Sequence, residues 1–186
     1  MKLFIAPHND DEVLFGAWTL LTHREEVTVA IVYDSFVQAS RGVPGCDAAA
    51  RRRESIAALA VLGIDRVHFL GLRDCDPIFD QARWEHALDE IIGDQQPEAV
   101  FAPAWEQDGH PQHNFVGAVS VTAFRNLTRY LTYTAIGRST VGREVAFKPE
   151  WVRLKLQALA CYKSQFDFRL GCWPHFLGSQ REYYAR

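Results

Sequence analysis

The chain has 186 residues, of which 48% are hydrophobic and 23% charged, a balance typical of a globular protein. Its 12 Phe, 6 Tyr and 5 Trp residues, with a formal net charge of only -3, exclude disorder as the main state. Since 23 acidic residues outnumber 20 basic ones, no overall positive field is available for nucleic acid or an anionic membrane.

Length and cysteine usage favour a single domain in a reducing compartment. We expect one domain, residues 1–186, because domains commonly have about 150 residues. No stretch approaches the roughly 18 to 20 apolar residues of a membrane span, and the apolar N-terminal stretch is shorter than a signal-peptide core. The four cysteines form no Cys-x-x-Cys pair, as a zinc knuckle would require. We therefore expect a cytoplasmic protein.

Short apolar runs alternate along the chain with segments of helical periodicity. The runs predict buried strands at 3–6, 27–33, 67–70 and 99–102, and helical spacing predicts helices at 13–21, 47–62, 84–92 and 111–123. Two further strands are predicted at 129–136 and 144–147 and a last helix at 149–162, whereas the aromatic C-terminal residues show no clear pattern. This order predicts an α/β fold, a Rossmann-like three-layer α/β/α sandwich with a mostly parallel sheet.

Two polar clusters follow strands of this predicted sheet, each at the start of a helix. Residues 7–12 (Pro-His-Asn-Asp-Asp-Glu) come directly after the first strand, and residues 108–113 (Asp-Gly-His-Pro-Gln-His) follow the fourth. In an open α/β sheet, ligands bind beyond the carboxyl ends of the strands, and a doubly wound sheet can bring two such loops together. The two clusters are therefore the candidate functional site.

The residue types in these clusters fit a zinc hydrolase. His8 and Asp11 can converge on one point across a strand-to-helix turn, and His113 can supply a third ligand. Zinc prefers imidazole and carboxylate ligands, and a catalytic zinc keeps three protein ligands plus water. Asp10 is then a spare carboxylate that can take a proton from this water, and His110 can stabilise an oxyanion.

Each cluster also has an ordinary structural interpretation. Asn, Asp and Glu at a helix start are common caps and dipole partners, and proline at the first helical position is routine. Taken alone, each cluster favours that interpretation. Their joint position at two strand ends favours the metal site.

Other classes of protein fit the sequence less well. Paired acids such as Asp10 and Asp11 also occur in magnesium-binding receiver domains, but magnesium prefers oxygen ligands whereas imidazole suits zinc. No G-x-G-x-x-G follows the first strand, as a dinucleotide site would require, and no G-x-S-x-G supplies a nucleophilic serine. Two alternatives stay open: a zinc amidase acting on a non-sugar N-acyl substrate, and a non-catalytic metal-binding α/β module.

The two clusters together resemble the motifs of a known family. Residues 6–12 (Ala-Pro-His-Asn-Asp-Asp-Glu), followed by residues 110–113 (His-Pro-Gln-His), are similar to the PIG-L/LmbE-like superfamily of zinc-dependent N-acetylglucosamine deacetylases. Two further segments resemble this family: the Arg-x-x-Glu helix at 51–54 with its terminal Leu-Gly, and the segment from Lys155 to Ser164-Gln165. The resemblance covers most of the chain, from about residue 2 to residue 165.

The resemblance implies an enzyme that hydrolyses an N-acetyl amide, usually on an amino sugar that is either a small molecule or part of a glycoconjugate. It implies one Zn²⁺ per chain, with another divalent transition metal as an alternative, bound by His8, Asp11 and His113. It further implies Asp10 as the general base and His110 as the residue that stabilises the tetrahedral intermediate. A homo-oligomer stays open, because this chain is short for the family and a neighbouring subunit could complete the substrate surface.

Several further residues are candidates for contacting the substrate. Arg51 matches the arginine that contacts substrate in the family, whereas the rest of the 51–53 run reads as a solvated helix turn. Four more candidates lie near predicted strand ends or in the loop at 36–46, which we expect to act as a lid: Asp34, Arg41, Trp105 and Asp108.

Two positions depart from the pattern of the family. Asn9 stands where the family usually has proline, which changes backbone stiffness but removes no ligand. Gln112 stands where the family usually has aspartate, and in the family that carboxylate lies near the position of His110. Because a neutral amide supports an imidazolium less well than a carboxylate does, we expect His110 to be less basic here than in relatives.

Overall fold

Seven strands form one sheet in the part of the chain that the structure describes. The computed structural model describes residues 1–34, 47–73, 81–93, 96–105, 110–132, 142–166 and 181–185. The strands are β1 (Lys2–Ala6), β2 (Val27–Asp34), β3 (Val67–Arg73), β4 (Ala99–Pro103), β5 (Leu127–Tyr130), β6 (Gly142–Glu144) and β7 (Tyr183–Ala185). Their order across the sheet is β3-β2-β1-β4-β5-β7-β6. The pairs from β3 to β5 are parallel, and only the pairs that involve β7 are antiparallel.

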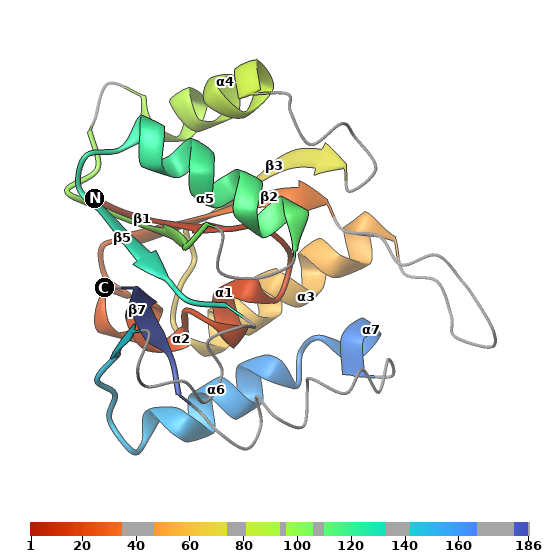
Figure 1. Cartoon of the computed structure of the whole chain (residues 1–186). Coiled ribbons are helices and arrows are strands. Elements are labelled where there is room, and N and C mark those ends of the chain that lie inside the picture. Colours follow the sequence, from red (N-terminus) through yellow and green to blue (C-terminus); the bar gives the residue numbers. More distant parts are fainter. Residues whose placement is uncertain are drawn as a thin grey trace.

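Helices cover both faces of this sheet (Figure 1). They are α1 (Asp11–Leu14), α2 (Ala17–Thr22), α3 (Ala48–Val61), α4 (Gln81–Ile92), α5 (Pro111–Ala123), α6 (Trp151–Leu159) and α7 (Lys163–Phe166). One core packs under α4 and α5, and the other packs under α1, α2, α3 and α6. The expected three-layer sandwich with a mostly parallel sheet is therefore confirmed.

Alternate residues of β1 enter these two cores. Leu3 and Ile5 belong to the core under α4 and α5, whereas Phe4 and Ala6 belong to the core on the opposite face. Successive side chains of a strand point to opposite faces, so a central parallel strand must be apolar at every position. This double burial explains why β1 stands out in the sequence as a continuous apolar run.

The direction of strand progression reverses at β1. From β1 the chain continues to β2 and β3 on one side, and later crosses over to β4 and β5 on the other side. Open α/β sheets bind ligands at such a switch point, beyond the carboxyl ends of the strands. The loops after β1 and β4, which contain the two polar clusters, flank this point.

One predicted helix is divided in two. Instead of a continuous helix at 13–21, the structure has α1 and α2, separated by Phe15 and Gly16. A Cβ atom at Gly16 would lie only 2.2 Å from the Phe4 ring, so the chain approaches β1 here at a distance that glycine alone permits. The prediction for α3 is confirmed, because Asp47 accepts a 2.6 Å hydrogen bond from the amide of Ala50 and Gly63 follows with a φ of 78°.

The late strands also differ from the prediction. β5 begins two residues before the expected start at 129, and β6 lies at 142–144 rather than 144–147. Residues 183–185, for which no element was expected, form β7 between β5 and β6. Among the described residues, none of the helices combines the length and the apolar character that crossing a bilayer requires.

Candidate metal centre

Two loops at neighbouring strand ends bring the polar residues together. His8, Asp10 and Asp11 follow β1, whereas His110 and His113 lie at the start of α5, shortly after β4. β1 and β4 are paired in parallel. Side chains 105 positions apart in the sequence therefore meet at one edge of the sheet.

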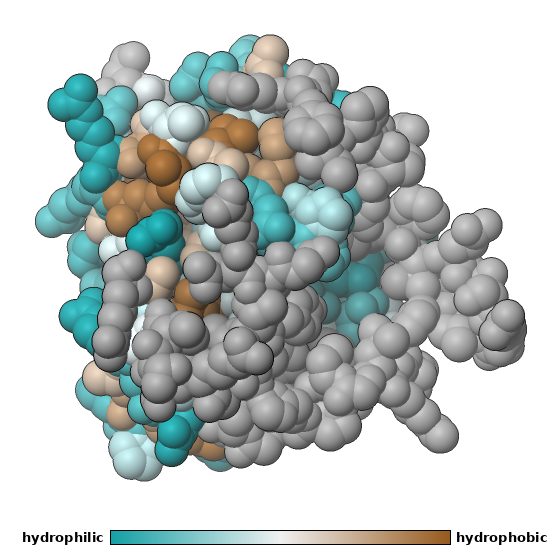
Figure 2. Space-filling view, viewed as in Figure 1, coloured by the Kyte–Doolittle hydropathy of each residue, from teal (hydrophilic) through white to brown (hydrophobic). Residues whose placement is uncertain are grey.

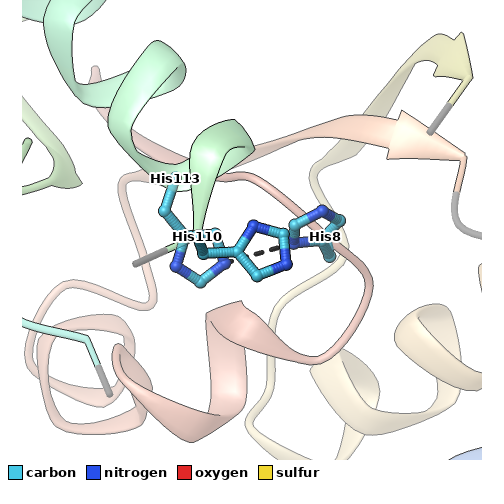
Figure 3. Close-up of side chains that lie close together, drawn as sticks. All are labelled: His8, His110 and His113. Carbon is cyan, nitrogen blue, oxygen red and sulfur yellow. Dashed lines mark hydrogen bonds between the residues drawn. The ribbon is translucent and has the colours of Figure 1, made fainter. Parts of the chain in front are cut away.

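Three atoms that could each bind a metal ion form a compact triangle at this edge, called here the donor triangle. His8 Nδ1 lies 3.2 Å from both Asp11 Oδ2 and His113 Nε2, and His113 Nε2 lies 3.0 Å from Asp11 Oδ2. The side chains of Asp11 and His113 are each 1% exposed, and that of His8 is 12% exposed. Figure 3 shows His113 reaching from α5 toward His8. The three residues expected to bind metal thus come together.

The donor triangle has dimensions close to those of a metal site. Bonds of about 2.0 to 2.2 Å to a tetrahedral ion place neighbouring ligand atoms roughly 3.3 to 3.6 Å apart. Asp11 gives a second indication, because its Oδ1 is buried and makes no hydrogen bond within the described part of the chain. A buried acceptor without a partner is unfavourable, and a cation would satisfy it. Two imidazoles and one carboxylate therefore fit zinc or a similar divalent ion.

His110 lies beside this triangle and offers an alternative third ligand. The candidate ligand atoms of His8, His110 and His113 all lie within 4.8 Å of one another. The His110 ring stacks on that of His113 at a centroid distance of 4.5 Å and meets that of His8 edge-on at 4.8 Å (Figure 3). The set with Asp11 is tighter, at 3.0 to 3.2 Å, and is the better candidate for the ligand set.

Asp10 has an unusual backbone conformation directly before α1. Its φ is 122°, a value that residues other than glycine rarely adopt and that is often associated with function. Its amide donates a 2.8 Å hydrogen bond to Glu12 Oε2, and its Oδ2 lies 3.4 Å from Arg51 Nη2. Arg51 also donates to the carbonyl oxygen of Asn9. The Asp10 carboxylate is thus held by backbone and side-chain contacts together.

The adjacent carboxylates of Asp10 and Asp11 have opposite electrostatic environments. Burial raises the pKa of Asp10 well above its usual value, against the opposing charge of Arg51. Burial also acts to raise the pKa of Asp11, but the charges and hydrogen bonds of His113 and His8 outweigh it and hold that pKa well below its usual range. Neighbouring carboxylates with separated pKa values are suited to different tasks, one as a proton carrier and the other as a ligand.

Four buried polar residues that lie beneath the site have no role predicted from the sequence, although Asn9 and Glu12 belong to the first polar cluster. The hydroxyl of Tyr162 donates a 2.5 Å hydrogen bond to Glu12 Oε1, and Asn9 Nδ2 donates to Ser55 Oγ at 3.2 Å. All four side chains are fully buried. Asn9 and Tyr162 lie outside the helices, so helical periodicity could not mark them as buried polar residues.

The three consecutive arginines near the start of α3, residues 51–53, lie in three different environments. Arg51 is 3% exposed and faces Asp10, whereas Arg53 is exposed. Arg52 makes a two-point ion pair with Asp34 at the end of β2, with Nε 2.8 Å from Oδ1. The Arg52 side chain is 38% exposed, so it is partly solvated as expected, while its guanidinium engages the Asp34 carboxylate.

Of the remaining substrate candidates, one can be placed. Trp105 follows β4 and is 38% exposed. Arg41, Asp108 and the expected lid at 36–46 lie outside the described residues. In the view of Figure 2, hydrophilic side chains line a recess beside α3, below the first turn of α5.

Gln112 contacts one of the candidate ligands. Its Oε1 lies 2.8 Å from His8 Nε2, the ring nitrogen on the side away from the donor triangle. The family aspartate at this position was expected to bear on His110 instead. The lower basicity expected for His110 stays a prediction.

Comparisons with known proteins agree with these observations. A family model described as GlcNAc-PI de-N-acetylase (PIG-L) matches residues 3–124, more than half of the chain. No curated protein is significantly similar to the sequence.

Several solved structures share the fold. One is N,N'-diacetylchitobiose deacetylase from Pyrococcus horikoshii, with 23% identity, a TM-score of 0.77 and coverage of 100% of this chain and 82% of that one. Another is a triple mutant of a deacetylase involved in teicoplanin biosynthesis, with 23% identity, a TM-score of 0.75 and coverage of 95% and 86%. The 4-carboxy-2-hydroxymuconate hydratase from Pseudomonas putida KT2440 also matches, with 17% identity, a TM-score of 0.72 and coverage of 100% and 95%. Since a hydratase shares the architecture, the fold alone does not determine the reaction.

Proposed function

The chain belongs to the GlcNAc-PI de-N-acetylase (PIG-L) family, and we propose from this premise that it removes the N-acetyl group of an amino sugar with one bound zinc ion. The family consists of N-deacetylases, which are hydrolases acting on amide bonds. One observation carries the proposal: His8 Nδ1, Asp11 Oδ2 and His113 Nε2 lie 3.0 to 3.2 Å from one another in a buried position. Both imidazoles lie within hydrogen-bond distance of the Asp11 carboxylate, and a shared ion would bind all three side chains at once.

In this proposal, His8, Asp11 and His113 hold the metal ion. The chemistry that such an ion supplies when bound is to lower the pKa of water and to polarise an amide carbonyl. Asp10 takes the proton of the attacking water, since it is the neighbouring carboxylate that is left outside the ligand set. The contact with Arg51 at 3.4 Å orients the Asp10 carboxylate for this task.

His110 stabilises the charge that develops on the substrate oxygen. It precedes the first turn of α5, and its ring lies 4.5 Å from that of His113 and 4.8 Å from that of His8. A donor held there can bond to the oxygen as water adds to the amide carbon. When the C–N bond then breaks, the nitrogen takes up the proton held by Asp10, and acetate and a free amine leave.

The substrate is proposed to be a small N-acetylated sugar. Trp105 supports this, because a partly exposed indole shortly after β4 offers a flat apolar face for a sugar ring. We also propose that residues 1–186 form one domain, which is consistent with two cores packed against opposite faces of one sheet.

The test combines metal analysis with detection of the products. Metal content is measured by mass spectrometry, and acetate and free amine are measured over a panel of N-acetylated amino sugars and N-acylated compounds without a sugar. We expect one zinc per chain and turnover of the sugars. Turnover of the non-sugar amides alone would favour a general amidase, and metal binding without turnover of any amide would favour a non-catalytic module.

Substitution of the proposed base separates its role from that of the ligands. Asp10→Asn should keep the metal and lose about 10²- to 10⁴-fold in turnover, the usual contribution of a general base. Asp89→Asn, on the exposed side of α4, is the matched control and should change neither property. Near-normal turnover of Asp10→Asn would exclude Asp10 as the base.

A further inference from the structure

The side-chain amide of Gln112 contacts His8, a proposed metal ligand, on the ring nitrogen that faces away from the donor triangle. Gln112 Oε1 is 2.8 Å from His8 Nε2, while the other ring nitrogen, Nδ1, faces Asp11 and His113. An amide oxygen can only accept a hydrogen bond, so this contact favours a proton on Nε2. The Asp11 carboxylate, which can likewise only accept, competes for that proton at Nδ1 until a metal ion occupies the triangle. Nδ1 then keeps its lone pair for the donor triangle.

We propose that Gln112 is a positioning residue, which fixes His8 in the Nε2–H tautomer and thereby makes Nδ1 available to the metal ion. The inference rests on the proposed function, since it presupposes a metal ion in the triangle of His8, Asp11 and His113. Metal-bound histidines usually donate their second ring N–H to such a partner, which sets both tautomer and ring orientation.

The first turn of α5 supplies two side chains to this site. His113 points one donor into the triangle, and the preceding residue, Gln112, reaches the ring of a different ligand. The His8 ring is also stacked on the Tyr33 ring at 5.6 Å and meets His110 edge-on. Its plane is therefore set by its aromatic neighbours, and the amide determines which nitrogen carries the proton.

The length of the side chain matters more than its charge in this interpretation. Asp11 and the neighbouring Asp10 and Glu12 already give the site three carboxylates within five positions of His8. A neutral acceptor orients His8 without adding a fourth negative charge. Glutamate at position 112 keeps the reach of glutamine, whereas aspartate is one methylene shorter and should not span the 2.8 Å contact.

The first measurement uses metal-free protein with ¹⁵N-labelled histidine. Long-range ¹⁵N–¹H correlations identify the tautomer of His8, whose signals are assigned by their loss in His8→Gln. We expect a larger share of the Nε2–H form in the wild type and in Gln112→Glu than in Gln112→Leu and Gln112→Asp. An unchanged tautomer in Gln112→Leu would overturn the proposal.

The second measurement is zinc affinity, obtained by competition with a chelator. Gln112→Leu and Gln112→Asp should bind zinc about 10- to 100-fold more weakly, the usual effect of losing such a partner, and Gln112→Glu should restore the affinity. Gln157→Leu, on the exposed side of α6, is the matched control. Equal affinity of Gln112→Leu and wild type would contradict the proposal. If the wild type binds no metal, the proposed function fails, whereas the tautomer measurement still decides the role of Gln112.

Discussion

The hydroxyl of Tyr162 donates a 2.5 Å hydrogen bond to the carboxylate of Glu12, although 150 positions separate the two residues. The other oxygen of Glu12 accepts the amide of Asp10 at 2.8 Å. Burial raises the pKa of Glu12 and raises that of Tyr162 well above its usual value, so the phenol stays protonated as a donor. The segment after α6 thus supports, through Glu12, the strained peptide of the proposed base.

Tyr162→Phe should therefore lower both stability and turnover. It leaves Glu12 Oε1 buried without its donor, which typically costs about 1 to 3 kcal/mol. Turnover should fall because the Asp10 peptide loses part of its support, while zinc content is retained. Urea unfolding, a kinetic assay and metal analysis measure the three quantities.

Tyr184→Phe is the matched control for this variant. The Tyr184 hydroxyl lies 2.6 Å from Thr19 Oγ1, in a hydrogen bond remote from the metal site. Its removal should lower stability and leave turnover unchanged. An equal loss of turnover in both variants would mean that the effect of Tyr162 is only a general loss of stability.

Arg51 has two candidate roles that kinetics can separate. The resemblance to the family implies contact with substrate, whereas its guanidinium is buried against Asp10 and the carbonyl of Asn9. We expect Arg51→Lys to lower kcat by roughly 10-fold or more with little change in KM, because a point charge does not replace the planar guanidinium. Arg53→Lys, at the exposed neighbour, should match the wild type. A rise in KM at constant kcat would instead indicate substrate binding.

The order of elements could be predicted because buried parallel strands are apolar on both faces. β1 through β4 appear as continuous runs for this reason, and α3 carries its own cap and stop signals. The break between α1 and α2 could not be predicted, since it depends on the proximity of Gly16 to the Phe4 ring. β7 was missed because its three residues are defined only by pairing with β5 and β6.

The site residues that directly follow strands could be predicted from the sequence. The buried residues beneath them could be predicted less well. The residues following β1 and β4 carry recognisable ligand types, so their convergence could be expected. Contacts between distant segments have no local signature: Glu54 accepts the amide of Ser164 at 2.8 Å and its hydroxyl at 2.6 Å. Likewise, the pairing of Arg52 with Asp34 cannot be distinguished in the sequence from a solvated charge.

Replacing each of the two histidines of α5 should distinguish the alternative ligand sets. If Asp11 is the third ligand, His113→Ala loses zinc, whereas His110→Ala keeps zinc and loses turnover. The side chain of His113 is 1% exposed and its Nε2 is 3.0 Å from Asp11 Oδ2, so its removal opens the triangle. Chelator competition measures affinity in both variants. Loss of zinc in His110→Ala, with zinc retained in Asp11→Asn, would instead support the set of three imidazoles.

A buried ion pair joins α6 to the residue that precedes β7, and both partners also bond to the backbone of the first helices. Lys155 Nζ lies 2.6 Å from Glu182 Oε1, donates to the carbonyl of Leu14 at 3.0 Å, and lies 4.8 Å from the centre of the Trp18 ring. Both charged side chains are at most 2% exposed. Removing one partner of such a pair leaves an uncompensated charge in the core.

Lys155→Met should consequently destabilise the protein by about 3 to 5 kcal/mol in urea unfolding. The double variant Lys155→Met with Glu182→Gln should be less destabilised than the sum of the two single variants, because no buried charge remains unpaired. Lys163→Met, at an exposed lysine, should have little effect. Additive effects of the two substitutions would show that the pair is not coupled.

The pair also makes stability depend on pH. Burial raises the pKa of Glu182, against the opposing effects of Lys155 and of the hydrogen bond from the Trp18 amide. The folded state then binds the proton of Glu182 more tightly than the unfolded state does. The stabilisation that this proton gives is therefore fully present below the unfolded-state pKa of about 4.3. It is lost as the pH rises through the folded-state pKa. Glu182→Gln removes this titration, so its unfolding free energy relative to the wild type should improve with rising pH above about 4.3 and then level off. Urea unfolding of both metal-free proteins from acid to neutral pH measures the difference, and a constant or falling difference would contradict the prediction.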